Sequence, residues 1–122
     1  MAYYTATYSF GSTGLKTLIL DLGGATPKGL RITMGPRNNT TESVQLLSVG
    51  MTDGTNTHCI ATCPSFSKKW PYTSQPNYLI AHHSASGTKV FSATFDSWSA
   101  DEAVINVDTA NANYPLLVEA WS

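Results

Sequence analysis

The side chains in this sequence that are best suited to chemistry are two cysteines and three histidines. Cys59 and Cys63 are four positions apart, His58 precedes the first, and His82 and His83 follow further along. Two thiolates with one or two imidazoles can hold zinc in a tetrahedral site, and a disulfide across three intervening residues is a second possibility. No second cysteine pair accompanies them, so we expect two reduced, partly buried thiols, and neither a metal nor a cofactor.

His82 and His83 end an expected strand over residues 77–83, so their side chains should point to opposite faces. One is expected to be half-buried and hydrogen-bonded and the other exposed. A catalytic histidine needs a nucleophile and an orienting carboxylate, and no G-x-S-x-G motif marks a nucleophile. The acidic side chains lack the spacing of a glycosidase pair or a calcium loop, and we expect solvated turn residues at Asp96, Asp101, Glu102 and Asp108. The sequence therefore predicts a protein that is not an enzyme.

Aromatic side chains among Ser, Thr, Asn and Asp are the better candidates for contact with a partner. Trp70 and Tyr72 lie in the proline-rich segment 63–76, which we expect to be a long loop, and Trp98 follows an expected strand. Such rings suit stacking on a sugar or a central position in a protein interface. The alternative for Trp98 is a place in the core. The candidate contact or ligand-binding residues are Trp70, Tyr72, His82, His83 and Trp98.

The composition excludes several classes of partner. Only 12% of the 122 residues are charged, the formal net charge is -1, and the seven basic side chains do not form a patch that could neutralise a run of phosphates. There is no apolar run near the length needed to cross a bilayer, and the N-terminus has no pattern of a secretion signal. We therefore expect no nucleic acid partner and no membrane insertion. A surface this low in charge is typical of a domain that packs against copies of itself or a larger assembly, or of one that contacts carbohydrate. A monomeric β-domain with an uncharged surface is the third alternative.

Alternation of apolar and polar residues, with turn signals every 8 to 12 residues, predicts about nine short strands and no helix. Residues 15–22 are apolar on both faces, which indicates a central strand, and Asp53-Gly54 predicts a hairpin turn. The whole chain is expected to be one domain, an all-β antiparallel β-sandwich of jelly-roll or other Greek-key form. The expected strands are 1–10, 15–22, 30–34, 42–51, 55–62, 77–83, 91–96, 103–107 and 114–121.

Three stretches resemble the small β-sandwich domains of bacteriophage virion proteins, in head decoration proteins, fibres and tail-fibre tips. They are LKTLILDLGGATPKGLRITMG, SVQLLSVGMTDGTNTHCIAT and KVFSATFDSWSADEAVINVDTANANYPLLVEAW, and the last is also similar to the closing strands of H-type lectin domains. The resemblance implies a virion structural protein, made in the host cytoplasm, that forms a trimer or another homo-oligomer and docks on other virion proteins. The alternative is a lectin-like receptor-binding module for host surface glycans.

Overall fold

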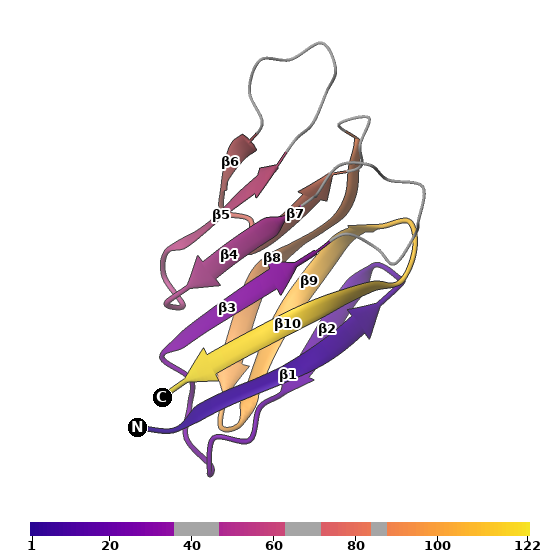
Figure 1. The fold of residues 1–122 in the computed structure, drawn as a ribbon. Coiled ribbons are helices and arrows are strands. Elements are labelled where there is room, and N and C mark those ends of the chain that lie inside the picture. The colour runs from indigo at the N-terminus through magenta and orange to yellow at the C-terminus, as the bar shows by residue number, and fades with distance from the viewer. Residues whose placement is uncertain (36–46, 63–71, 84–87) are drawn as a thin grey trace.

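The fold is a sandwich of two antiparallel sheets, described here from a computed structural model (Figure 1). The structure describes residues 1–35, 47–62, 72–83 and 88–122, with the backbone alone for residues 62 and 72–76. These residues form ten strands and no helix. The six-stranded sheet, sheet A, has the order β1-β10-β3-β4-β5-β6, and the four-stranded sheet, sheet B, has the order β2-β9-β8-β7. The strands are β1 (Tyr3–Phe10), β2 (Gly14–Ile19), β3 (Gly29–Met34), β4 (Ser48–Thr52), β5 (Thr57–Thr62), β6 (Tyr72–Pro76), β7 (Ile80–His83), β8 (Lys89–Ser99), β9 (Glu102–Ala110) and β10 (Tyr114–Trp121).

Strands from the two ends of the chain pair with each other in both sheets. In sheet A, β10 lies between β1 and β3, and in sheet B, β9 pairs with β2. The spatial order β10-β3-β4-β5 has the form of a Greek key, because β10 returns by a long path to lie beside the first of three consecutive strands. The termini lie side by side, where the Ser122 amide donates to the Ala2 carbonyl at 3.1 Å (Figure 1). The predicted antiparallel β-sandwich is confirmed.

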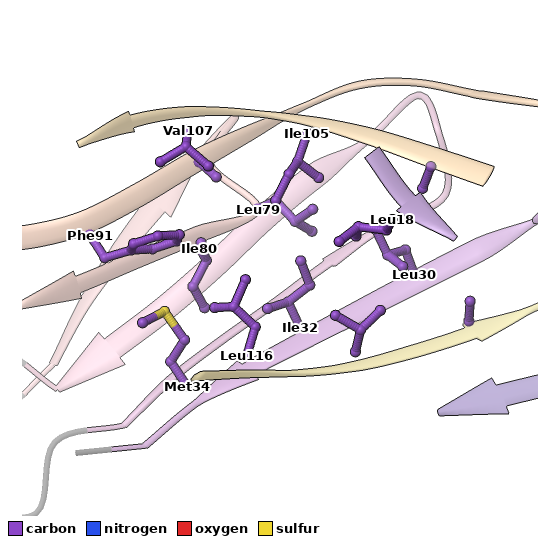
Figure 2. Packing of buried hydrophobic residues seen from close by; sticks show 14 of the residues in the cluster. Leu18, Leu30, Ile32, Met34, Leu79, Ile80, Phe91, Ile105, Val107 and Leu116 are labelled. Atoms are coloured by element: carbon purple, nitrogen blue, oxygen red, sulfur yellow. The ribbon is translucent and has the colours of Figure 1, made fainter. Parts of the chain in front are cut away.

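The core lies between the inner faces of the two sheets. Both sheets contribute aliphatic side chains that pack against one another, and the fully buried Phe91 lies at one end of the labelled residues (Figure 2). Burying each large aliphatic or aromatic side chain contributes about 1.5–3 kcal/mol, so this cluster supplies the main driving force for folding. Figure 2 labels Leu18, Leu30, Ile32, Met34, Leu79, Ile80, Phe91, Ile105, Val107 and Leu116.

The backbones of the two sheets approach each other closely where Gly50 of β4 faces Leu79, the residue before β7. A Cβ atom on Gly50 would lie 1.5 Å from the Leu79 carbonyl oxygen, so only glycine fits at this position. Nearby, the buried Ser48 hydroxyl donates to the Ala81 carbonyl at 3.2 Å and lies 3.4 Å from the Ala81 amide. Since β4 and β7 belong to different sheets, these contacts join the two layers through backbone groups as well as through side chains.

Two expected elements differ from the structure. Segment 15–22 was expected to be a central strand, but β2 lies at the edge of sheet B, and Leu15 and Ile19 are 63% and 58% exposed. Only the other face of the segment enters the core, through Leu18, Leu20 and Leu22. The expected loop 63–76 contains a strand, because residues 72–76 pair with β5 as the sixth strand of sheet A. Pro76 ends β6 at the edge of the sheet, a place where proline is tolerated because its missing N–H is not needed for pairing.

Aspartates organise two of the turns. The Asp53-Gly54 hairpin turn between β4 and β5 is confirmed, and Gly54 adopts a φ of 91° there. Asp101, in the turn between β8 and β9, has a φ of 57°, and its carboxylate accepts bonds from the amides of Leu22 at 2.8 Å and Gly24 at 2.9 Å. The expectation of a solvated Asp101 is wrong, because the side chain is half-buried and holds the segment after β2 against this turn.

Candidate functional site

Both histidines of β7 lie inside the sandwich. His82 is 2% exposed and His83 is 7% exposed, so the expectation that one of them is exposed is wrong. Both faces of β7 are covered, because Ala81, which precedes the register shift at His82/His83 and faces away from His82, is fully buried as well. The His82 ring lies edge-on to Tyr114, with centroids 5.8 Å apart, and burial lowers the pKa of His82 to about 4 with a smaller contribution from His83.

Trp98 occupies a half-buried position at the end of the sandwich. Its ring lies edge-on to Phe95, with centroids 4.9 Å apart, and a Cβ atom on Gly54 would lie 2.5 Å from the indole. Trp98 therefore packs against the β4–β5 turn and the core. Tyr72 begins β6, but its side chain is not among the described ones, and Trp70 lies outside the described residues. The structure thus does not bring the five predicted contact residues into one described cluster.

The remaining predicted chemistry concerns the cysteines. Cys59 lies on β5 with its side chain buried, as expected, and Cys63 lies outside the described residues. Within ranges 1–35, 47–62, 72–83 and 88–122, no three side chains of the His, Cys, Asp and Glu types come together as metal ligands would. The same residues contain no helix long and apolar enough to cross a membrane.

A hollow of about 320 Å³ opens on the outer face of sheet A, next to the β4–β5 turn. Three parts of the chain line it. The start of β3 contributes Lys28 and Gly29, the end of β10 contributes Trp121, and the hairpin contributes Met51, Asp53 and Asn56. Its volume is at the lower end of the range for small-ligand sites.

Trp121 contributes to the lining of this hollow, and its indole packs directly against a glycine. Gly29 is opposite Trp121 in the β3–β10 register, and a Cβ atom on Gly29 would lie 2.1 Å from the indole carbon Cζ2. The Lys28 amide donates to the Trp121 carbonyl at 2.8 Å, which fixes the strand end from which the ring projects. Any larger residue at position 29 would displace the indole from this place.

Asp53 provides a rigid anionic group at the opposite side of the hollow. Its Oδ1 accepts bonds from the amides of Thr55 at 2.8 Å and Asn56 at 2.7 Å, and its Oδ2 accepts from the Asn56 side-chain amide at 3.1 Å. These hydrogen bonds stabilise the ionised form and lower the pKa of Asp53 to about 2. The carboxylate is therefore charged at neutral pH and held in one orientation.

An ion pair between Arg31 and Glu119 lies beside the hollow on the outer face of sheet A. The Arg31 guanidinium contacts the Glu119 carboxylate through two bonds of 2.8 Å and 2.5 Å, and the Tyr3 hydroxyl donates to the same carboxylate. Arg31 lowers the pKa of Glu119, and the hydrogen bond to Glu119 raises the pKa of Tyr3. The three side chains come from β3, β10 and β1 and tie these neighbouring strands together across their outer face.

The edge of sheet A at β1 is a regular strand whose outward backbone groups have no strand partner among the residues that the structure describes. All eight residues of β1 pair in register with β10. The bond from the Ser122 amide to the Ala2 carbonyl fixes which alternate residues face β10. The N–H and C=O groups of the residues between them point away from β10, to the free edge. These outward residues are Tyr3, Thr5, Thr7 and Ser9.

The other three sheet edges carry features that discourage pairing with another chain. β6 has five residues and ends in Pro76. β7 has four residues and an irregular register. β2 starts at Gly14, whose φ is 109°, and includes a charged Lys16. β1 is longer than these three strands, contains no charge and no proline, and has no bulge. Among the described edges, β1 is therefore the one suited to sheet extension.

Neither the hollow nor the β1 edge was predicted from the sequence. The alternation of Tyr3–Phe10 predicted a strand, and its inner face, with Tyr4 and Tyr8, is half-buried as that pattern requires. Whether this strand lies at an edge depends on the order in which the strands pair, and the alternation of residue types gives no information on that order. The absence of charge over residues 3–10 was the available signal, because sheet edges ordinarily carry charges. Trp121 is brought onto Gly29 by the pairing of β10 with β3, two strands that are far apart in the sequence, so no local pattern could predict this contact.

Comparison with known proteins found no protein-family model, no curated protein and no solved structure that matches this chain.

Proposed function

We propose that this protein is a non-enzymatic structural subunit that self-associates through the free edge of β1. The observation that carries the proposal is a regular, uncharged edge strand of eight residues, in a molecule whose other described edges are short, irregular or charged. An exposed strand of this kind is a template for pairing with a further strand. A second copy of the chain supplies an identical strand, and its uncharged surface offers no repulsion.

The alternation of backbone groups selects one register for this pairing. Two β1 strands related by a two-fold axis run antiparallel, and all four outward-facing residues form hydrogen-bonded pairs when the axis passes at Ala6. Tyr3 then pairs with Ser9 of the second copy, and Thr5 pairs with Thr7. Such Thr–Thr contacts across antiparallel strands are favourable. The product is a dimer with one continuous sheet of twelve strands, two copies of six-stranded sheet A.

The place of such a subunit in a bacteriophage virion, as capsid decoration or as a tail appendage, is proposed from the sequence resemblance described above. The β-sandwich fold and the low charge are compatible with it, although one fold serves many functions. The two-fold dimer differs from the trimer that the resemblance implies. Docking on other virion proteins would use surfaces that remain free in the dimer.

The edge pairing predicts the effect of introducing lysines on β1. The variant Thr5→Lys/Thr7→Lys places lysines opposite one another in both central pairs of the dimer, while both positions are exposed in a single copy. We expect wild-type protein to have twice the 13.1 kDa mass of the chain by size-exclusion chromatography with light scattering. The variant is expected to associate at least about tenfold more weakly, because like charges directly opposite are destabilising.

A matched control adds the same charge elsewhere. Thr17→Lys/Asn106→Lys places two lysines at exposed positions on the outer face of sheet B, and it should keep the dimer mass. A monomeric wild-type protein at every concentration would contradict self-association. A double-lysine β1 variant that keeps the wild-type mass would contradict the edge as the contact surface.

A further inference from the structure

We infer that the hollow beside Trp121 is a saccharide-binding site, in which a neutral pyranose ring stacks on the indole and its hydroxyl groups bond to Asp53 and Asn56. The inference does not rest on the edge pairing, because β1 contributes no residue to the lining of the hollow. It differs also from the sequence-based expectation, which placed glycan contacts at Trp70, Tyr72 and Trp98.

The stacking surface is fixed before any ligand arrives. The indole of Trp121 lies against Gly29, and the backbone on both sides of it is held by the β3–β10 pairing. The side chain therefore loses little conformational freedom on binding, which is the main cost of using a large side chain as a contact. The apolar face of a pyranose, made of C–H groups, suits a flat aromatic surface of this size. The thioether of Met51, which is 47% exposed, adds apolar contact from the hairpin side.

The polar groups that line the hollow include both acceptors and donors, and a sugar hydroxyl can bond to either kind. Asp53 Oδ2 accepts one bond, from Asn56, and a carboxylate oxygen has room to accept another from a sugar hydroxyl. The Asn56 side chain adds a carbonyl oxygen at the same wall, and the exposed Lys28 ammonium can donate to a hydroxyl oxygen. Two acceptors and one donor around an aromatic wall are the groups that fix the orientation of a neutral polar ligand.

The charges at the hollow favour a neutral sugar over an anionic ligand. Asp53 and Lys28 balance each other, and the adjacent Arg31 is already engaged by Glu119 in an ion pair. A phosphate or a sulfated sugar would face the fixed Asp53 carboxylate with only Lys28 to offset it. The hollow is therefore better suited to a hexopyranoside than to a nucleotide.

The test is a titration of ¹⁵N-labelled protein with methyl β-D-galactopyranoside, methyl α-D-mannopyranoside and methyl β-D-glucopyranoside, followed by NMR. At least one glycoside is expected to shift the indole N–H signal of Trp121 and the backbone amide of Asn56 in a saturable way. The Trp121 signal is identified by its loss in Trp121→Ala. That variant should bind at least about tenfold more weakly, as read from the Asn56 amide, because the stacking surface is gone.

Two further variants separate loss of the site from loss of the fold. Gly29→Ala keeps the tryptophan but displaces its indole, so it should also weaken binding. Leu117→Ala removes an exposed side chain from the same strand and the same face, away from the hollow, and should bind as wild type. The inference is overturned if none of the three glycosides shifts these signals. It is equally overturned if folded Trp121→Ala and Gly29→Ala bind a glycoside as tightly as wild type.

Discussion

Gly50→Ala is expected to destabilise the protein by at least about 3 kcal/mol, a large effect for the addition of one methyl group. The added Cβ atom would lie 1.5 Å from the carbonyl oxygen of Leu79 and 2.9 Å from the Cβ atom of Cys59. The first of these neighbours is backbone, so no side-chain rotation relieves the overlap. Strand β4 would have to move away from β7, which would stretch the bonds between Ser48 and Ala81. Urea denaturation of both proteins measures the difference.

Gly35→Ala is the matched control for this prediction. A Cβ atom on Gly35 would meet no atom of the described residues within 4 Å, and its φ is outside the left-handed region. The substitution should leave stability nearly unchanged or raise it slightly, because alanine restricts the unfolded chain. Equal stability of Gly50→Ala and Gly35→Ala would contradict the close approach of the two sheets at β4 and β7.

Acidification from about pH 6.5 to pH 4 is expected to destabilise the protein by about 2–3 kcal/mol through His82. The pKa of His82 in the folded protein is about 4, below its ordinary value of 6.5, because burial disfavours the imidazolium. Between these two values the unfolded chain binds a proton that the folded protein does not. The free energy of unfolding therefore falls as the pH falls through this range, and the full contribution of His82 is present above it.

The variant His82→Phe should lose this pH dependence. Phenylalanine keeps a ring next to Tyr114 but cannot take up a proton, so its free energy of unfolding should change much less between pH 6.5 and pH 4. His58→Gln, at an exposed position on β5, is the control and should retain the wild-type slope. Thermal or urea unfolding at several pH values measures both slopes. Identical slopes for wild type and His82→Phe would contradict the buried, neutral state of His82.

Alternation in the sequence was sufficient to predict the fold class and the two faces of the clearest strands. Tyr3–Phe10 and Tyr114–Trp121 show period-two burial in the structure, as their residue patterns require. Alternation could not distinguish an edge strand from a central one, and for this reason residues 15–22 were wrongly predicted to be a central strand. Its apolar Leu15 and Ile19 indicated burial on both faces, but no neighbouring element covers that face in the described part of the chain.

The candidate site could not be predicted from the sequence, because it too depends on which strands pair. Trp121 became a wall of the hollow because the register places it on Gly29, and Asp53 became part of the opposite side because the β4–β5 hairpin lies beside β3. Alternation gives the face of each residue but not the residue across from it. The prediction for the histidines of β7 failed for another reason. Alternation assigns their side chains to opposite faces of the strand, but it does not show that both faces of β7 are covered, as the burial of all four of its residues requires.

Amide hydrogen exchange along β1 is the most direct measurement of the proposed self-association. In a single copy, the amides of Tyr4, Ala6 and Tyr8 bond to β10, while those of Thr5 and Thr7 face solvent. Pairing of two β1 edges would protect both sets, so the account predicts slow exchange at every one of these positions at concentrations where the dimer forms. Alternating slow and fast exchange under those conditions, with Thr5 and Thr7 unprotected, would contradict it.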